Sequence, residues 1–153
     1  MEARRAAGLM ARTAPLVWMT MVVVAMMLAP GQPAGALDQA EVVAAKNAEA
    51  WLVLVDQHKY GASWDAAAGL FKDTVDRDMW TDALGAVRGP LGKLLSRRVK
   101  SVESRPSLPG APDGRYVIIQ YETSFENKKA AVETVTPMLE ADGSWKVTGY
   151  FVK

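Results

Sequence analysis

The sequence predicts an α+β domain in which N-terminal helices pack on one face of a curved antiparallel sheet of about four strands. Three observations predict this fold class. Apolar residues recur at helical spacing between about residues 39 and 92. From about residue 96 the pattern changes to alternating apolar and polar residues, which is typical of half-buried strands. Helices followed by a meander of strands indicate helices segregated to one side of an antiparallel sheet.

Residues 1–36 have the pattern of a secretory signal peptide. A basic head with three arginines precedes an uninterrupted apolar run over 14–28, and small residues stand at Ala34 and Ala36. We expect cleavage after Ala36, which leaves one domain, residues 37–153, in the periplasm or outside the cell. The apolar run is shorter than the roughly 20 residues that span a bilayer. A retained anchor is therefore the less favoured alternative, and it would be the only expected contact with a membrane.

Composition excludes several classes of site. The 153-residue chain contains no cysteine, which excludes disulfides, thiolate metal sites and cysteine nucleophiles. Residues 37–153 hold 15 basic and 16 acidic residues, and this near-neutral balance gives no argument for a nucleic-acid partner. The single histidine, His58, stands in no metal-ligand motif, so we expect no metal and no cofactor. A triad of Ser63, His58 and Asp65 is disfavoured because all three lie within eight residues and no GxSxG elbow is present.

The helical half is predicted to contain three helices. The first spans about residues 39–57 and begins with a capping-box-like pattern. We predict that Gly61 ends it in a left-handed conformation and that Ser63 caps a short second helix over 64–71. A third helix over about 76–92 is stopped by a Gly-Pro pair.

The sheet is predicted to contain four strands, over about 96–105, 115–125, 130–140 and 144–153. The first carries a bulge, because Val99 and Val102 are out of step. Pro137 cannot donate to a ladder and marks an edge, a bulge or a non-bonded position. An Asp-Gly pair at 142–143 predicts a tight hairpin. The loop over 107–114, dense in proline and glycine, is a candidate contact surface.

Six residues are candidates for a pocket: Tyr60, Trp64, Asp65, Tyr121, Glu133 and Tyr150. An aspartate beside a tryptophan can have a raised pKa and act as an acid or base. In the structural alternative, Trp64 belongs to the core and Asp65 is a first-turn carboxylate favoured by the helix dipole. Glu133 alternates with apolar neighbours, which places it on the covered side of the sheet, where a carboxylate is costly unless paired. Arg115 and Lys146 on adjacent strands are its expected partners.

The phrases "SLPGAPDG" (107–114) and "DGSWKVTGY" (142–150) resemble a bacterial family of exported proteins, domain-of-unknown-function family 4019. The order of "AEAWLVLVD", "SWDAA" and "RGPLG" extends the resemblance over nearly all of the chain after the signal segment. The helical half followed by a meander ending in "DGxWxV" is similar to the nuclear-transport-factor-2-like superfamily, which implies a cone-shaped fold. That superfamily includes isomerases, dehydratases and binding modules without catalysis, so the resemblance selects no function.

These observations favour an exported, non-enzymatic module that holds a small apolar ligand in the cone or binds a protein partner. They leave open a homodimer paired through the sheet, and also a purely structural envelope protein. The alternative is a cofactor-independent enzyme of the ketosteroid-isomerase or dehydratase kind. Its base would be Asp65 or Glu133, and its donor Tyr60, Tyr121 or Tyr150. A deep pocket in which one carboxylate and one tyrosine converge would favour the enzyme.

Overall fold

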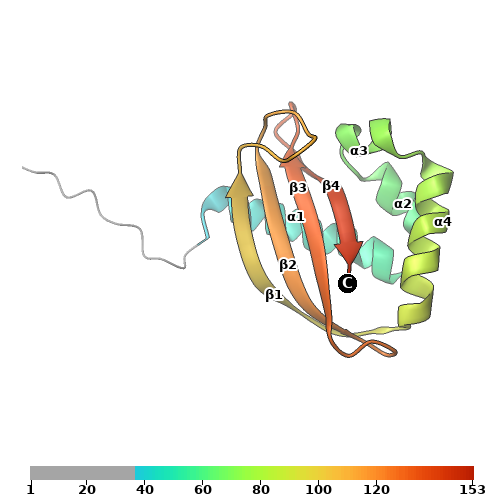
Figure 1. Ribbon diagram of the computed structural model, residues 1–153. Helices are drawn as coiled ribbons and strands as arrows, with labels where there is room; N and C mark the ends of the chain where they lie inside the picture. Colours follow the sequence, from blue (N-terminus) through green and yellow to red (C-terminus); the bar gives the residue numbers. More distant parts are fainter. Residues whose placement is uncertain (1–36) are drawn as a thin grey trace, which may run out of the picture. The chain divides into compact units, whose positions relative to one another are not determined.

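The computed structural model describes residues 37–153, so the predicted signal segment and its cleavage site lie outside the described residues. The described part contains four α-helices, a short 3₁₀ turn and four strands (Figure 1). In chain order they are α1 (Gln39–Asp56), α2 (Tyr60–Asp65), α3 (Gly69–Thr74), α4 (Arg77–Arg88), η1 (Gly89–Leu91), β1 (Leu94–Arg105), β2 (Tyr116–Phe125), β3 (Ala131–Leu139) and β4 (Trp145–Val152). The strands form one antiparallel sheet in the order β1-β2-β3-β4, and α1 packs across it. The predicted α+β class is confirmed.

Helix α1 forms where its cap and its apolar face predict it. The Asp38 carboxylate accepts the Glu41 backbone N–H at 2.7 Å, and the Glu41 carboxylate accepts the Asp38 N–H at 3.1 Å. This capping box satisfies two N–H groups that the first turn leaves without a helical partner. The buried side chains of α1 recur at helical spacing on the sheet-facing side: Ala44, Ala48, Trp51, Leu52 and Val55.

The prediction that Gly61 ends the first helix is wrong. The chain leaves α1 through His58, which has a positive φ of 59°. Histidine is one of the non-glycine residues that most often adopt this left-handed conformation. Gly61 lies inside α2, where a Cβ atom would come within 3 Å of the Arg77 guanidinium group. The glycine therefore allows a close side-chain contact instead of a turn.

The predicted cap at Ser63 and the helix over 64–71 are also wrong. Ser63 is fully buried inside α2, and α3 starts only at Gly69. The Ser63 hydroxyl donates to the Tyr60 carbonyl and accepts the indole N–H of Trp80 at 3.0 Å. The Ser63 carbonyl accepts the indole N–H of Trp51 at 2.7 Å. Ser63 of α2 thus links Trp51 of α1 to Trp80 of α4.

Two irregularities of the sheet agree with the sequence. The β1–β2 register shifts between Val99 and Ser101, which confirms the predicted bulge. The β3–β4 register shifts between Thr136 and Pro137. Since β3 is an interior strand, Pro137 marks a bulge, which was one of its three expected roles.

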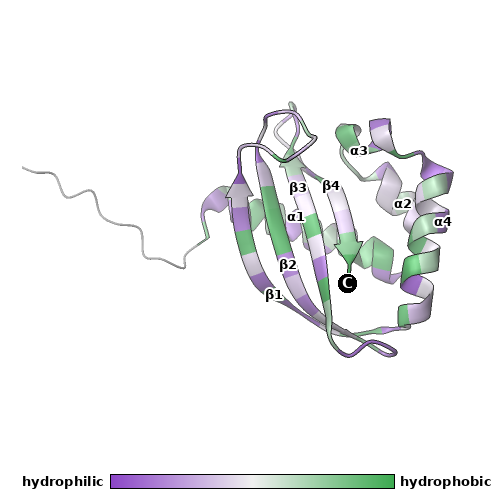
Figure 2. Cartoon of the chain, in the orientation of Figure 1, coloured by the Kyte–Doolittle hydropathy of each residue, from purple (hydrophilic) through white to green (hydrophobic). Residues whose placement is uncertain are grey.

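Aromatic side chains fill the space between the sheet and the shorter helices. Phe71 packs edge-on against Trp80 with ring centroids 4.9 Å apart, and Trp51 lies 6.1 Å from Trp80. The gap between these rings, Val147 and Tyr150 has no room for a water molecule. Apolar residues gather along α1 and β2 (Figure 2). Within residues 37–153, no helix has both the length and the apolar character needed to cross a membrane.

Candidate functional site

Four charged side chains meet between the helices and the sheet, and we call them the buried ionic cluster. Asp56 is the last residue of α1 and Arg88 is the last of α4. Arg97 comes from β1 and Glu133 from β3. Two guanidinium groups thus face two carboxylates, so the cluster is neutral as a whole. It ties both long helices to two strands of the sheet.

Glu133 is the most enclosed member, with a side chain that is 0% exposed. Its Oε1 accepts hydrogen bonds from Arg88 Nη1 at 2.9 Å, Arg97 Nη2 at 3.1 Å and the Tyr150 hydroxyl at 2.7 Å. Its Oε2 accepts from Arg97 Nε and from the Thr123 hydroxyl, both at 2.7 Å. Five donors therefore surround one carboxylate, and its lone-pair sites are occupied by the protein itself.

Asp56 completes the charge balance from the side of α1. Its carboxylate accepts from Arg88 Nη2 at 2.7 Å and from Arg97 Nη1 and Nη2 at 2.7 and 2.9 Å. The Arg88 guanidinium also lies 4.5 Å above the ring of Phe125, a cation–π contact. Buried charges are tolerated only when they are paired and hydrogen-bonded in this way.

The tyrosines around the cluster hold their protons. Burial, reinforced by the negative charge of Glu133, raises the pKa of the Tyr150 hydroxyl well above its ordinary value. Burial also raises the pKa of Tyr121 to about 12 and raises the pKa of Tyr60. Within the described residues, the hydroxyls of Tyr121 and Tyr60 have no hydrogen-bond partner, whereas that of Tyr150 bonds Glu133 and Arg88.

The structure brings some of the six predicted pocket residues together and separates others. Glu133 and Tyr150 are in direct contact, and Tyr121 pairs with Glu133 across β2 and β3. Asp65 lies elsewhere, with its side chain 56% exposed.

Asp65 is bonded bidentately to Arg77, which lowers the pKa of the carboxyl group. It is the last residue of α2, so the expectation of a first-turn carboxylate is wrong. Trp64 packs against the core and donates its indole N–H to the Val75 carbonyl at 2.7 Å.

The expected partners of Glu133 are also corrected. Arg115 lies over the ring of Trp145, and Lys146 pairs in register with Met138, away from the cluster. The true partners, Arg88 and Arg97, are 45 and 36 residues away in sequence.

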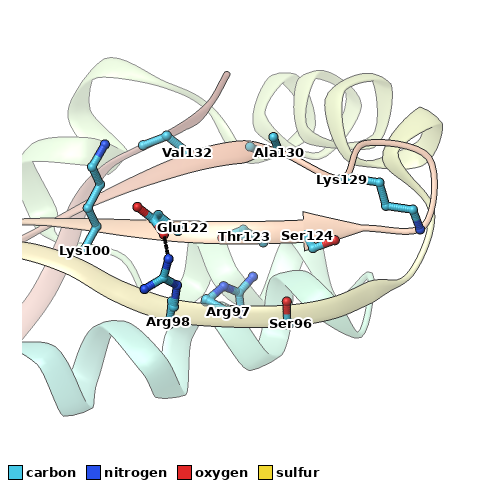
Figure 3. Close-up of a pocket in the computed structure, with 11 residues that line it drawn as sticks. Ser96, Arg97, Arg98, Lys100, Glu122, Thr123, Ser124, Lys129, Ala130 and Val132 are labelled. Atoms are coloured by element: carbon cyan, nitrogen blue, oxygen red, sulfur yellow. Dashed lines mark ion pairs between the residues drawn. The ribbon is translucent and has the colours of Figure 1, made fainter.

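A groove on the opposite face of the sheet is the second candidate site (Figure 3). It has a volume of about 470 Å³ and is open to solvent. Its floor is β2, with Glu122 and Ser124, and its walls come from β1 and from the β2–β3 hairpin. Arg98 and Lys100 line the β1 wall, and Lys129 lies at the hairpin. The lining residues are Ser96, Arg97, Arg98, Lys100, Glu122, Thr123, Ser124, Lys129, Ala130, Ala131 and Val132.

One carboxylate of the groove is already paired, since Arg98 and Glu122 form an ion pair across β1 and β2. Within the described residues, Lys100 and Lys129 form no ion pair. The charge of Arg97 belongs to the buried ionic cluster, on the other face. The groove therefore presents two unpaired positive charges to solvent.

A metal-binding cluster and a role for the single histidine are the two remaining possibilities in the described residues. Across residues 37–153, no three histidine, cysteine, aspartate or glutamate side chains lie close enough together to hold a metal ion. His58 is exposed just beyond α1, and its ring lies 5.7 Å from that of Tyr60.

The fold and the two sites define a class of protein: a small α+β domain with an ion-paired interior and an open basic groove on its sheet. The chain belongs to the family described as protein of unknown function DUF4019, whose model matches residues 47–150. A comparison with curated proteins finds no match.

Proposed function

We propose that this domain is a non-enzymatic binding module that acts after export, in the periplasm or outside the cell, once cleavage has removed residues 1–36. One observation carries the proposal. Of the two candidate bases of the enzymatic alternative, Glu133 is 0% exposed and accepts five hydrogen bonds from the protein, and Asp65 is bonded bidentately to Arg77. A general base must reach the proton that it abstracts.

The contact of Glu133 with Tyr150 is the feature that favours an enzyme of the isomerase or dehydratase kind. Carboxylate and hydroxyl do converge, at 2.7 Å. Protein donors nevertheless occupy both oxygens of Glu133, and the gap between Tyr150 and the rings of Trp51, Phe71 and Trp80 has no room for a water molecule. We therefore regard catalysis as the second candidate, and a nuclear-transport-factor-2-like cone as the fold in which either function would operate.

Binding at the surface is the version of this function that the geometry supports best. A small apolar ligand in the interior would have to displace Trp51, Trp80 or Phe71, which pack against one another. A protein or peptide partner needs no such displacement. A homodimer through the sheet is one form that such a partner could take.

The test uses the full chain purified from an export host. It is screened by ¹H–¹⁵N NMR against peptides and small apolar compounds, and 3-ketosteroids and 3-hydroxyacyl thioesters are added as turnover probes. We expect saturable shifts of surface amides and no product. Product formation that disappears in Tyr150→Phe, while the variant keeps its fold, would overturn the proposal in favour of the enzyme.

A further inference from the structure

We infer that the groove on the outer face of the sheet binds an extended, acidic peptide segment of a partner protein. This inference rests on the proposed function and names the site and the chemistry of its partner. Four observations carry it: the distribution of charge, the two unpaired lysines, the shape of the groove and its openness.

Charge is divided between the two halves of the described domain. Residues 37–93, which form the helices, hold nine acidic and six basic residues, whereas residues 94–153, which form the sheet, hold seven and nine. A near-neutral domain thus has an acidic helical side and a basic sheet. Such a division favours encounter with a partner of opposite charge on the sheet side.

The groove concentrates this positive charge at a fixed place. Lys100 on β1 and Lys129 at the hairpin stand at its two walls, and Arg98 stands beside Lys100 (Figure 3). Ser96 and Ser124 are register partners across β1 and β2, and both line the groove. The lysines are donors for carboxylates, and the serines can donate or accept towards a peptide backbone.

The shape of the groove favours a chain over a small molecule. Sites for small ligands enclose most of the ligand surface, whereas this groove is open to solvent. Its β1 wall extends from Ser96 to Lys100, a rise of about 13 Å, which matches about four residues of an extended segment. Acidic residues at alternate positions of such a segment would face the sheet together, because side chains of an extended chain alternate sides.

The experiment is an NMR titration of the full chain, purified from an export host, with an N-acetylated peptide of alternating Glu and Ser, eight residues long. A peptide with Gln in place of each Glu is its control. We expect shifts over 96–100, 122–124 and 129–132 with the acidic peptide only. We also expect the affinity to fall as salt is raised, because exposed charges are screened.

The matched variants test the charges without disturbing the core. Lys100→Glu with Lys129→Glu should weaken binding by about ten-fold or more, since two exposed attractions become repulsions. The control, Lys46→Glu with Lys59→Glu, makes the same charge change at exposed positions of the helical side and should bind within about two-fold of the wild type.

Several results would overturn the inference. These are shifts outside the groove, equal weakening in both double variants, or no binding of the acidic peptide. Binding to phosphatidylglycerol vesicles without binding to the peptide would assign the groove to a lipid surface instead. Any of these results leaves the proposed function standing if another ligand binds. Turnover that depends on Tyr150, with the acidic peptide still bound in the groove, would overturn the non-enzymatic part of the proposed function and leave the assignment of the groove in place.

Discussion

Replacing Glu133 by glutamine should destabilise the domain by about 3–5 kcal/mol, the usual cost of removing one partner of a buried ion pair. The wild-type carboxylate faces Arg88 and Arg97 and is fully buried. In Glu133→Gln the two guanidinium groups retain only the single charge of Asp56, so one positive charge is left uncompensated. The amide N–H₂ group also brings a donor towards Arg97 or Arg88, which are themselves donors.

Urea denaturation measures this effect, with Glu122→Gln as the matched control. Glu122 lies on the neighbouring strand but on the outer face, where it pairs with Arg98 at the surface. An exposed pair contributes at most about 1 kcal/mol, so the control should unfold close to the wild type. With a slope of about 1–3 kcal/mol per molar urea, the midpoint of Glu133→Gln should fall by at least about 1 M. Equal midpoints for the two variants would refute the account of the cluster.

Four further predictions concern the buried tyrosine hydroxyls, Arg97 and His58. Tyr150→Phe should cost about 1.5–3 kcal/mol, because its hydroxyl donates to a charged carboxylate, whereas Tyr121→Phe should be neutral or stabilising in urea titrations, since that hydroxyl has no partner. Burial raises the pKa of both hydroxyls, so their contribution to wild-type stability should not change between neutral pH and about pH 9, and stability should fall as the pH rises from about 10 towards 12; a flat alkaline profile would contradict this. Arg97→Met should speed amide hydrogen exchange along β1 but Arg98→Met should not, because only Arg97 ties that strand to the cluster; equal exchange in both variants would exclude such a tie. His58→Gly should stabilise the domain by up to about 1 kcal/mol and so raise its thermal midpoint, because glycine adopts the left-handed conformation without the strain that a Cβ atom causes. A lower midpoint would show that His58 is not strained.

Local patterns in the sequence were sufficient for most of the fold. The capping box of α1, the bulge of β1 and the strand alternation depend on neighbours within a few residues, and they are found where they were predicted. The exit from α1 depends on a distant contact. Gly61 and His58 both suit a left-handed position. In the structure His58 adopts this conformation, whereas Gly61 lies in α2 with the Arg77 guanidinium packed against it.

The buried ionic cluster was only half predictable. Alternation along β3 placed Glu133 on the covered face, but its partners come from elements that only the tertiary fold brings near. A usable signal was nevertheless present. Asp56 continues the buried series Ala48 and Leu52 at four-residue spacing. Arg88 likewise continues the buried series Trp80 and Leu84 on α4, so charged residues that extend an apolar stripe predict buried pairs.

Two adjacent arginines on β1 connect the interior of the domain with its proposed binding face. Side chains of neighbouring strand residues point to opposite faces, so Arg97 reaches inward to Asp56 and Glu133 while Arg98 reaches outward to the groove. Since β1 is an edge strand, with hydrogen bonds to β2 alone within the sheet, the inward arginine supplies an anchor that the ladder cannot. A strand held in this way presents its outward charges in a fixed arrangement. A preformed groove loses less conformational entropy on binding than a mobile one, which makes even a few exposed charges effective in selecting an extended acidic partner.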